Sequence, residues 1–321
     1  MKLKIIVSNL IVFPAFKEYT YFKINNTNFG GIIMDNQRKD LAKAVLIADA
    51  LSFGAHWVYS TEKLKEKYSG IIDEYTEPMA KFHQGKEAGD LSHYGEQALS
   101  LLKSISEKQG FDLKQFRDDW IQHLKNNEMY MDHSMEESLE KFEDSDTLIG
   151  ADNVELGGIA RSLPIFVENE ISRQDFLDLV HLTHNGKVVD QTAEFVFAVI
   201  RDVLKGTDYK EALKDHKDIN QFIKDSFEKI GSKDQIVANA DQRGQGCSIE
   251  QGMPIVLDVL WNADNLLEAL TLNIMAGGDT SARAMVIAAV MAAAQDPAFI
   301  PEKLVDGYNK SEAVKKILAD Y

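Results

Sequence analysis

The segment from Ala284 to Ala294 (AMVIAAVMAAA) constrains the fold more than any other part of the sequence. It contains no charged or polar side chain, so a helix formed here would be apolar on every side. A helix of this kind in a water-soluble protein has to be buried on all its faces. Because a central helix needs other helices packed around it, the segment predicts one large all-α core.

The pattern of apolar residues is helical along nearly all of the chain from residue 37 onward. A first helix is indicated by apolar residues from Ala42 to Ala50 and runs into a turn at Gly54, and few alternating, strand-like runs compete with it. A second helix is expected from Ala98 to a stop at Gly110. Further helices are expected at 112–125, 134–142, 172–182, 188–205, 209–228, 250–261, 264–275, 280–294 and 310–320. No linker or repeat interrupts this pattern, which predicts a single domain over residues 34–321.

The charge balance argues against a protein that binds the nucleic-acid backbone. The chain has 35 Lys and Arg residues against 51 Asp and Glu residues, a formal net charge of −16. Affinity for phosphate backbones depends on Lys and Arg. Cys247 is the only cysteine, so the chain has no intramolecular disulfide, which fits a reducing compartment. We therefore expect a cytoplasmic protein.

The first 33 residues differ in composition from the rest. Four lysines against Glu18 give this stretch a net charge of +3, and an apolar run extends from Ile5 to Phe13 (IIVSNLIVF). The run is similar to the core of a signal peptide but lacks a small-x-small cleavage site after it, so secretion is the less favoured interpretation. The favoured one is a dispensable or disordered extension, with Met34 as an alternative start. No other stretch approaches the roughly 20 apolar residues of a membrane span.

Three turns stand out because each adjoins a predicted helix. Their sequences are DALSFGAHWVY (49–59), GDLSHYGEQ (89–97) and GGDTSARA (277–284). In the third turn Gly277 and Gly278 allow the backbone to bend, and Asp279 or Thr280 can cap the following helix. The same arrangement, a helix N-terminus with an acid nearby, can hold a phosphate or a metal ion that bridges to one. The turn therefore fits a simple helix cap or a ligand site.

These turns, in this order, resemble the ADP-ribosylglycohydrolase family. The resemblance includes DNVELGGIARSLPIF (152–166) and LTHNG (182–186), and extends over most of residues 37–295. Within the family, the chain is most similar to the divergent branch that includes the lens J-crystallins. The resemblance implies an orthogonal helical bundle with a central cleft. In active members it also implies hydrolysis of an N- or O-glycosidic bond between ADP-ribose and a protein side chain, assisted by two Mg²⁺ ions.

The chain departs from the family pattern at the residues expected to bind metal. His56 stands where the first family motif has glutamate, and Ser281 stands where the third has its second aspartate. The second motif, Thr-Asp-Asp-Thr in active members, aligns with His93, Tyr94, Gly95 and Glu96. Asp279 remains as the one clear metal ligand. Since Mg²⁺ prefers several anionic oxygen ligands, Asp279 with Glu96 and Asp49 would support one ion at most.

The substituted residues suggest a different chemistry. If the turns pack as the family fold implies, His56, His93 and Glu96 converge near Asp279 and could perform acid/base catalysis without metal. We therefore assign catalytic roles to these three residues. The resemblance and the residue types also indicate ligand-binding roles, for Asp49, Tyr94, Arg161, His184, Thr280 and Arg283.

Each of these residues also has a structural interpretation. His56 could be a packed histidine, Tyr94 could fill a gap, and Glu96 suits the first turn of any helix. His184 lies in a sequence that also suits a simple turn between helices, formed by Asn185 and Gly186. For Arg161 and Arg283 the alternative to ligand binding is a structural ion pair. Cys247 lies near the expected start of a helix. A place at the rim of the cleft suits it better than the role of a nucleophile.

The sequence thus supports two interpretations of function. The first is an ADP-ribosylglycohydrolase-like hydrolase that has a degraded magnesium site and acts on a small molecule or on an ADP-ribosylated protein. The second is a non-catalytic member of the same fold, which would be a crystallin-like structural protein or a module that binds ADP-ribose. Neither the linkage that would be cleaved nor the oligomeric state follows from the sequence.

Overall fold

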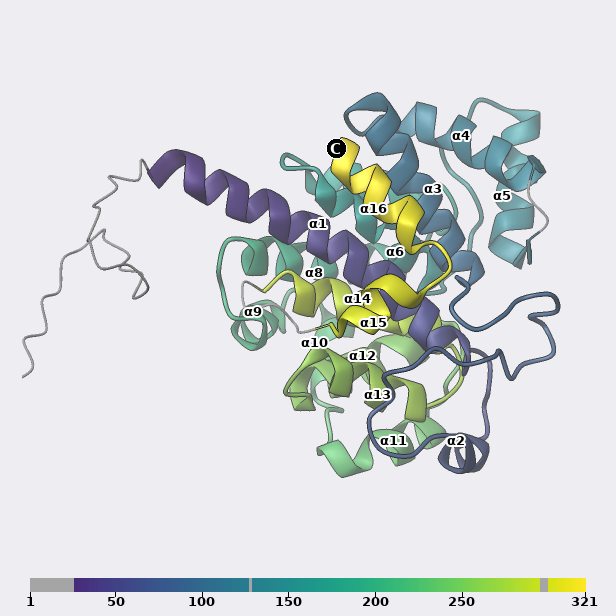
Figure 1. Ribbon diagram of the computed structural model, residues 1–321, viewed down its shortest axis with the longest axis vertical. Coiled ribbons are helices and arrows are strands. Elements are labelled where there is room, and N and C mark those ends of the chain that lie inside the picture. The colour runs from purple at the N-terminus through teal and green to yellow at the C-terminus, as the bar shows by residue number, and fades with distance from the viewer. Residues whose placement is uncertain (1–25, 127–128, 295–299) are drawn as a thin grey trace, which may run out of the picture.

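A computed structural model describes residues 26–126, 129–294 and 300–321 of the chain (Figure 1). Within these residues the structure consists of helices and loops, with two isolated β-bridges, Val58 with Gly278 and Glu155 with Ser248. The helices are α1 (Asn26–Phe53), α2 (Thr61–Lys67), α3 (His93–Lys108), α4 (Leu113–Asn126), α5 (His133–Asp144), α6 (Gly157–Ser162), η1 (Leu163–Val167), α7 (Arg173–His181), α8 (Lys187–Leu204), α9 (Tyr209–His216), α10 (Gln221–Phe227), η2 (Lys233–Gln235), α11 (Ile236–Arg243), α12 (Ile249–Asn262), α13 (Leu266–Met275), α14 (Thr280–Ala292), α15 (Glu302–Gly307) and α16 (Ser311–Asp320). The predicted all-α class is confirmed.

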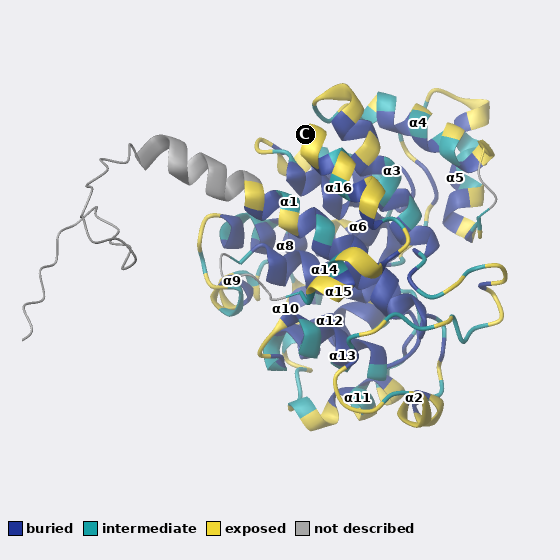
Figure 2. Cartoon of the chain, in the orientation of Figure 1, coloured by how far each residue is buried: buried dark blue, intermediate teal, exposed yellow. Residues whose placement is uncertain are grey.

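Helix α14 is the centre of the bundle, as the apolar segment predicted. Every residue from Thr280 to Ala292 is buried, and α14 packs most extensively on α1 and also against α6, α8, α12 and α13 (Figure 2). The helices around α14 place their apolar faces toward it and leave their polar faces at the surface. Burial on all sides explains why this helix carries alanine, valine, isoleucine and methionine around its whole circumference.

The predicted helix at 209–228 is wrong, because the structure has two helices there, α9 and α10. Asn220 begins α10: its side chain accepts a hydrogen bond from the N–H of Ile223 at 3.0 Å. A cap of this kind starts a new helix and so divides the apolar pattern into two elements. The helical pattern of the sequence does not predict α2, α6, α11 and α15, which are too short to show a clear helical period.

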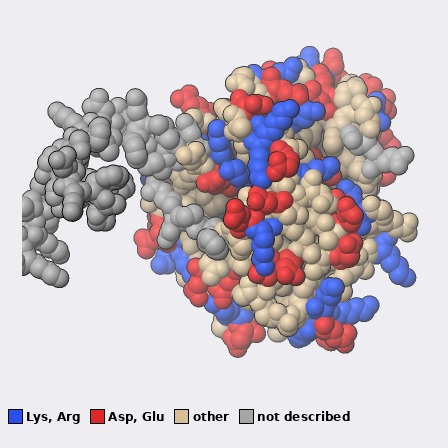
Figure 3. Space-filling view, viewed as in Figure 1, with Lys and Arg blue, Asp and Glu red and all other residues tan. Residues whose placement is uncertain are grey.

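The N-terminal region is described only in part. Residues 1–25, which include the apolar run at 5–13, lie outside the described residues, and α1 begins at Asn26, within the expected extension. Among the described helices, none combines the length and the apolar character needed to cross a bilayer. On the face shown in Figure 3, acidic and basic side chains are intermingled over the surface.

Candidate functional site

The double-glycine turn before α14 brings two distant segments together. Gly277 and Gly278 have φ angles of 73° and 71°, and the N–H of Gly278 donates to the carbonyl oxygen of Val58 at 2.8 Å. The N–H of Trp57, which itself has a φ of 62°, donates back to the carbonyl oxygen of Gly278 at 2.8 Å. A β-carbon on Gly278 would lie 2.0 Å from the carbonyl oxygen of Gln245, so glycine is required there. These contacts fix Asp279 beside the loop that carries His56.

Asp279 is the central carboxylate of the site and is fully buried. Its Oδ2 accepts a hydrogen bond from the Tyr94 hydroxyl at 3.2 Å, and its Oδ1 accepts from the N–H of Ala282 at 3.4 Å. Asp279 therefore caps α14, as the sequence suggested, and at the same time contacts a side chain from α3. Burial raises the pKa of this carboxyl, although the nearby charges of Arg283 and His93 act in the opposite direction.

His56 and Asp279 are arranged to share a proton. His56 Nδ1 lies 3.3 Å from Asp279 Oδ1, and the N–H of Ser281 points to the same nitrogen at 3.5 Å. Burial, together with the charges of His93 and His83, lowers the pKa of His56 well below its usual value, so the imidazole is neutral. Because the N–H of Ser281 donates to His56 Nδ1, this nitrogen is an acceptor, and a proton between it and Asp279 belongs to the carboxyl of Asp279. His56 therefore contacts Asp279 directly.

Asp49, the acid of the first motif, is held by Ser92. Its carboxylate accepts hydrogen bonds from the Ser92 N–H at 2.8 Å and from the Ser92 hydroxyl at 2.5 Å. Ser92 is the N-cap of α3, and Gly95 in the first turn leaves room for the carboxylate, since a β-carbon there would lie 2.0 Å from Asp49 Oδ2. Burial raises the pKa of Asp49 to about 6 despite these hydrogen bonds.

His93 and Asp132 form a second pair next to Tyr94. His93 Nε2 lies 3.1 Å from Asp132 Oδ2, and the rings of His93 and Tyr94 are 3.8 Å apart at their centroids. Burial acts to raise the pKa of Asp132, but the hydrogen bond and charge of His93 outweigh it and lower that pKa to about 2. Asp132 therefore stays ionised and orients the imidazole of His93.

The structure adds residues to the site that the sequence analysis did not assign to catalysis. Glu155 is half-buried, and burial together with the charges of Asp132 and Asp279 raises its pKa. The thiol of Cys247 lies beside Asp279, and burial raises its pKa, which argues against a reactive thiolate. Glu155 belongs to the segment DNVELGG (152–158), and backbone contacts of this segment with Cys247 and Ser248 bring it toward Cys247.

Arg161 and His184 lie together and share Thr183 as a partner. The Arg161 Nε donates to the Thr183 hydroxyl at 2.7 Å, and its Nη2 donates to the carbonyl oxygen of Leu179 at 2.9 Å. His184 contacts Thr183 through Nδ1 at 2.8 Å and Ser134 through Nε2 at 3.3 Å. The expected ion pair of Arg161 is absent among the described contacts; hydroxyl and carbonyl oxygens take its place.

Thr280 and Arg283 form hydrogen bonds with groups around the double-glycine turn. The Thr280 hydroxyl donates to the carbonyl oxygen of Ser52 at 2.9 Å. Arg283 donates from Nε to Asn273 Oδ1 at 2.9 Å and from Nη2 to the carbonyl oxygen of Gly277. Both side chains are fully buried, so their present contacts hold the turn in place.

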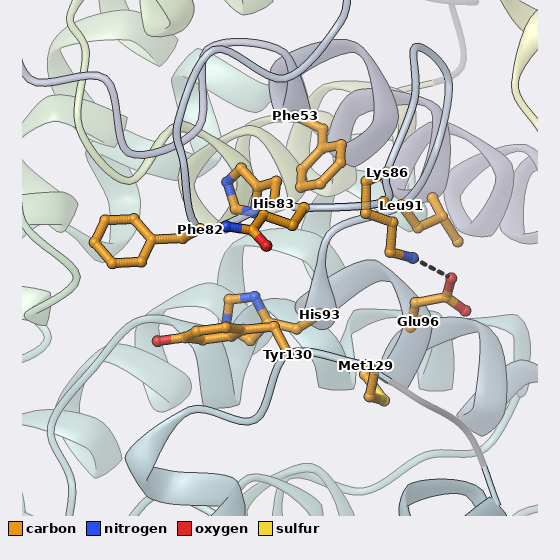
Figure 4. A pocket seen from close by; sticks show the side chains of 11 residues that line it. Phe53, Phe82, His83, Lys86, Leu91, His93, Glu96, Met129 and Tyr130 are labelled. Carbon is orange, nitrogen blue, oxygen red and sulfur yellow. Dashed lines mark hydrogen bonds and ion pairs between the residues drawn. The ribbon is translucent and has the colours of Figure 1, made fainter.

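Glu96, expected beside Asp279, points instead into a separate pocket. It forms an ion pair with Lys86 at 3.2 Å and lines a pocket of about 550 Å³ together with His93 (Figure 4). The structure therefore brings His56, His93, Tyr94 and Asp279 together, whereas Glu96 pairs with Lys86.

The donor set does not fit the two-ion magnesium site of active family members. Across the described ranges, no group of three or more His, Cys, Asp or Glu side chains is arranged to hold a metal ion. Asp49 is occupied by Ser92, and Asp279 by Tyr94 and the N-terminus of α14. Octahedral Mg²⁺ needs several free oxygen ligands in one place.

The comparison with known families agrees with the fold. The family model for ADP-ribosylglycohydrolase matches residues 37–321. The chain belongs to the ADP-ribosylglycohydrolase family.

Named relatives point to one branch of the family. Crystallin J1A of Tripedalia cystophora is 25% identical over 309 residues, which cover 87% of this chain and 95% of that protein. Crystallin J1B of the same organism is 24% identical over 303 residues, covering 84% and 92%. A solved structure described as an ADP-ribosylglycohydrolase-related protein complex has a TM-score of 0.68 at 15% identity, over 89% of this chain and 97% of that one. This last match shows a shared fold.

Proposed function

We propose that the protein hydrolyses a glycosidic bond of ADP-ribose or of a related nucleotide with its own acid and base groups, without a resident Mg²⁺ ion. The observation that carries this proposal is the buried contact of Asp279 with Tyr94 and His56, next to the His93–Asp132 pair. Ionisable groups with shifted pKa values gathered beside a pocket are typical of catalytic sites.

Two residues, Glu155 and His93, would carry out the two proton transfers of the hydrolysis. Glu155, whose raised pKa favours the protonated form, would give its proton to the leaving nitrogen or oxygen as the glycosidic bond breaks. His93, oriented by Asp132, would take a proton from the water whose oxygen bonds to the anomeric carbon. Tyr94 and His56 hold Asp279 in place, where its carboxylate can stabilise positive charge on the sugar.

The test is the release of ADP-ribose from ADP-ribosylated arginine and serine peptides, in EDTA and in Mg²⁺. We expect equal rates in both, and a loss of roughly 10²- to 10⁴-fold in kcat for Glu155→Gln. Glu250→Gln, the same change at an exposed position just after Cys247, should leave the rate unchanged. Activity that requires Mg²⁺ would contradict the metal-free mechanism, and no release from either peptide would contradict hydrolysis of these linkages.

The second candidate is a non-catalytic, crystallin-like protein. It is favoured by the two crystallin relatives and by the internal hydrogen bonds that occupy Asp49 and Asp279. Absence of both hydrolysis and ADP-ribose binding in calorimetric titration would support this candidate over the first.

A further inference from the structure

A second pocket, of about 500 Å³, lies at the C-terminal ends of α9, α10 and α12. Its lining consists of three apolar and five charged side chains. In Figure 1, α9 lies on the opposite side of the bundle from α3, whose first residues, His93 and Tyr94, belong to the Asp279 site. The pocket therefore shares no lining residue with that site.

The loops before and after α10 are fixed to neighbouring helices by hydrogen bonds. Asn220 begins α10, and its Nδ2 donates to the carbonyl oxygen of Gln191 on α8 at 2.9 Å. After α10, the N–H of Gly231 donates to Asp258 Oδ1 at 2.7 Å, and Asn262 Nδ2 donates to the carbonyl oxygen of Gly231 at 3.0 Å. The pocket is thus formed before a ligand enters, which lowers the entropic cost of binding.

The apolar side of the pocket consists of Phe227, Ile230 and Trp261, each of which is partly exposed. The rings of Trp261 and Phe227 meet edge-to-face, with centroids 6.2 Å apart, and Phe227 also packs against Phe195 of α8 at 6.1 Å. The two rings are therefore anchored to the core while part of their surface stays open. Open aromatic surface inside a pocket suits an apolar group of a ligand.

Two of the three lysines in the lining already have partners. Lys224 forms an ion pair with Asp218 at 3.3 Å. Lys214 lies 4.0 Å from Glu211 Oε1, and its Nζ is 5.7 Å from the centroid of the Trp261 ring. These contacts compensate most of the charge in the pocket.

The two remaining charged side chains of the lining are Lys217 and Glu228. Both are exposed, and neither forms an ion pair within the described part of the chain. The pocket thus offers one open ammonium group and one open carboxylate beside apolar surface. A simple anion would meet the charge of Glu228, and a simple cation would meet that of Lys217. A zwitterion can satisfy both.

We propose that this pocket binds a free α-amino acid with a large apolar side chain. The apolar side chain lies against Trp261 and Phe227, the carboxylate of the ligand contacts Lys217, and its ammonium group contacts Glu228. A residue inside a peptide chain lacks both of these charges, so the pocket selects the free amino acid. The inference goes beyond the proposed function, because it involves neither the residues nor the reaction of the Asp279 site.

The test is calorimetric titration of the full chain with three related probes. They are L-phenylalanine, L-phenylalaninamide, which has no carboxylate, and 3-phenylpropanoate, which has no ammonium group. The titrations are made at about pH 6, where α-amino groups are protonated. We expect phenylalanine to bind about fivefold more tightly than either analogue, since an exposed ion pair contributes little more than this.

Two variants assign the two charges of the ligand to their partners. Lys217→Gln should weaken phenylalanine about fivefold and leave phenylalaninamide unchanged. Glu228→Gln should weaken phenylalanine by a similar factor and leave 3-phenylpropanoate unchanged. Both positions are exposed, so the fold should not be affected. Lys108→Gln removes an exposed lysine at the end of α3 and should leave all three affinities as they are.

Three outcomes would overturn the proposal: no binding of phenylalanine, equal affinity of the wild type for phenylalanine and either analogue, or an equal effect of Lys217→Gln or Glu228→Gln on all three probes. The hydrolysis assay on the same wild-type preparation separates this proposal from the proposed function. Phenylalanine binding without hydrolysis contradicts only the catalytic proposal, and hydrolysis without phenylalanine binding contradicts only the pocket.

Discussion

The two ends of helix α14 are equally buried but opposite in chemistry. From Ala284 onward the helix is apolar and packs among apolar side chains, whereas its first turn meets Asp279, His56 and Tyr94. The apolar end is stabilised by dense packing and tolerates no unpaired charge. The polar end is stable because each carboxylate there has hydrogen-bond donors and a shifted pKa. Burial by itself therefore does not distinguish the core from the site; the partners of each polar group do.

The strongest test of this comparison places a carboxylate in the apolar end. Ala289→Asp puts an unpaired acid at a fully buried position of α14, and we expect a loss of more than about 4 kcal/mol in the free energy of unfolding or no folded protein. Urea unfolding measures this loss. Ala313→Asp, the same change at an exposed position of α16, should alter stability by less than about 0.5 kcal/mol. A loss under about 1 kcal/mol for Ala289→Asp would contradict the distinction between the two ends.

A second test uses the pH dependence of the polar end. Burial raises the pKa of Asp49 in the folded protein to about 6 from its ordinary value of 3.8, so Asp49 binds protons more tightly when the protein is folded. Its contribution to stability is present at low pH and is lost as pH rises through 6. The free energy of unfolding of the wild type minus that of Asp49→Asn should therefore fall by about 2 kcal/mol between pH 4.5 and 7.5.

Buried histidines change the free energy of unfolding with pH in the opposite direction. Their contributions cancel when the Asp49→Asn variant is subtracted from the wild type. Burial lowers the pKa of His83 to about 4 and of His184 to about 3, so their contributions are lost as pH falls below 6.5. Both are present in the wild type and in the variant. A pH-independent difference would show that Asp49 is ionised in the folded protein like an exposed aspartate.

The smallest expected effect concerns one hydrogen bond at the polar end. Tyr94→Phe removes the hydroxyl that donates to Asp279 and should cost about 1 kcal/mol, more at pH 8 than at pH 5, because the bond is stronger to an ionised carboxylate. Tyr68→Phe, which removes a hydroxyl 2.7 Å from the Thr76 hydroxyl, should cost about as much at both pH values. Chemical unfolding at the two pH values distinguishes them, and equal pH dependence would contradict a direct link to Asp279.

Several features of the site could be predicted from the sequence because they are local. The glycines of the third turn need positive φ angles, and Asp279 directly precedes a helix, so the turn and its cap follow from neighbouring residues. The contact of Asp279 with Tyr94 required the family resemblance, since nothing local relates residues 94 and 279. Glu96 shows the limit of that reasoning. Its position in the first turn of α3 directs its side chain to Lys86 and away from Asp279.

The sequence by itself determined the all-α class, the central position of α14 and the three turns, because helical period, glycine and capping residues act over a few neighbouring positions. Only the tertiary structure decided which carboxylates are occupied by internal partners and brought Glu155 toward Asp132 and Asp279. The reason is that hydrogen bonds, desolvation and pKa shifts depend on atoms brought together from distant segments, which the helical pattern does not specify.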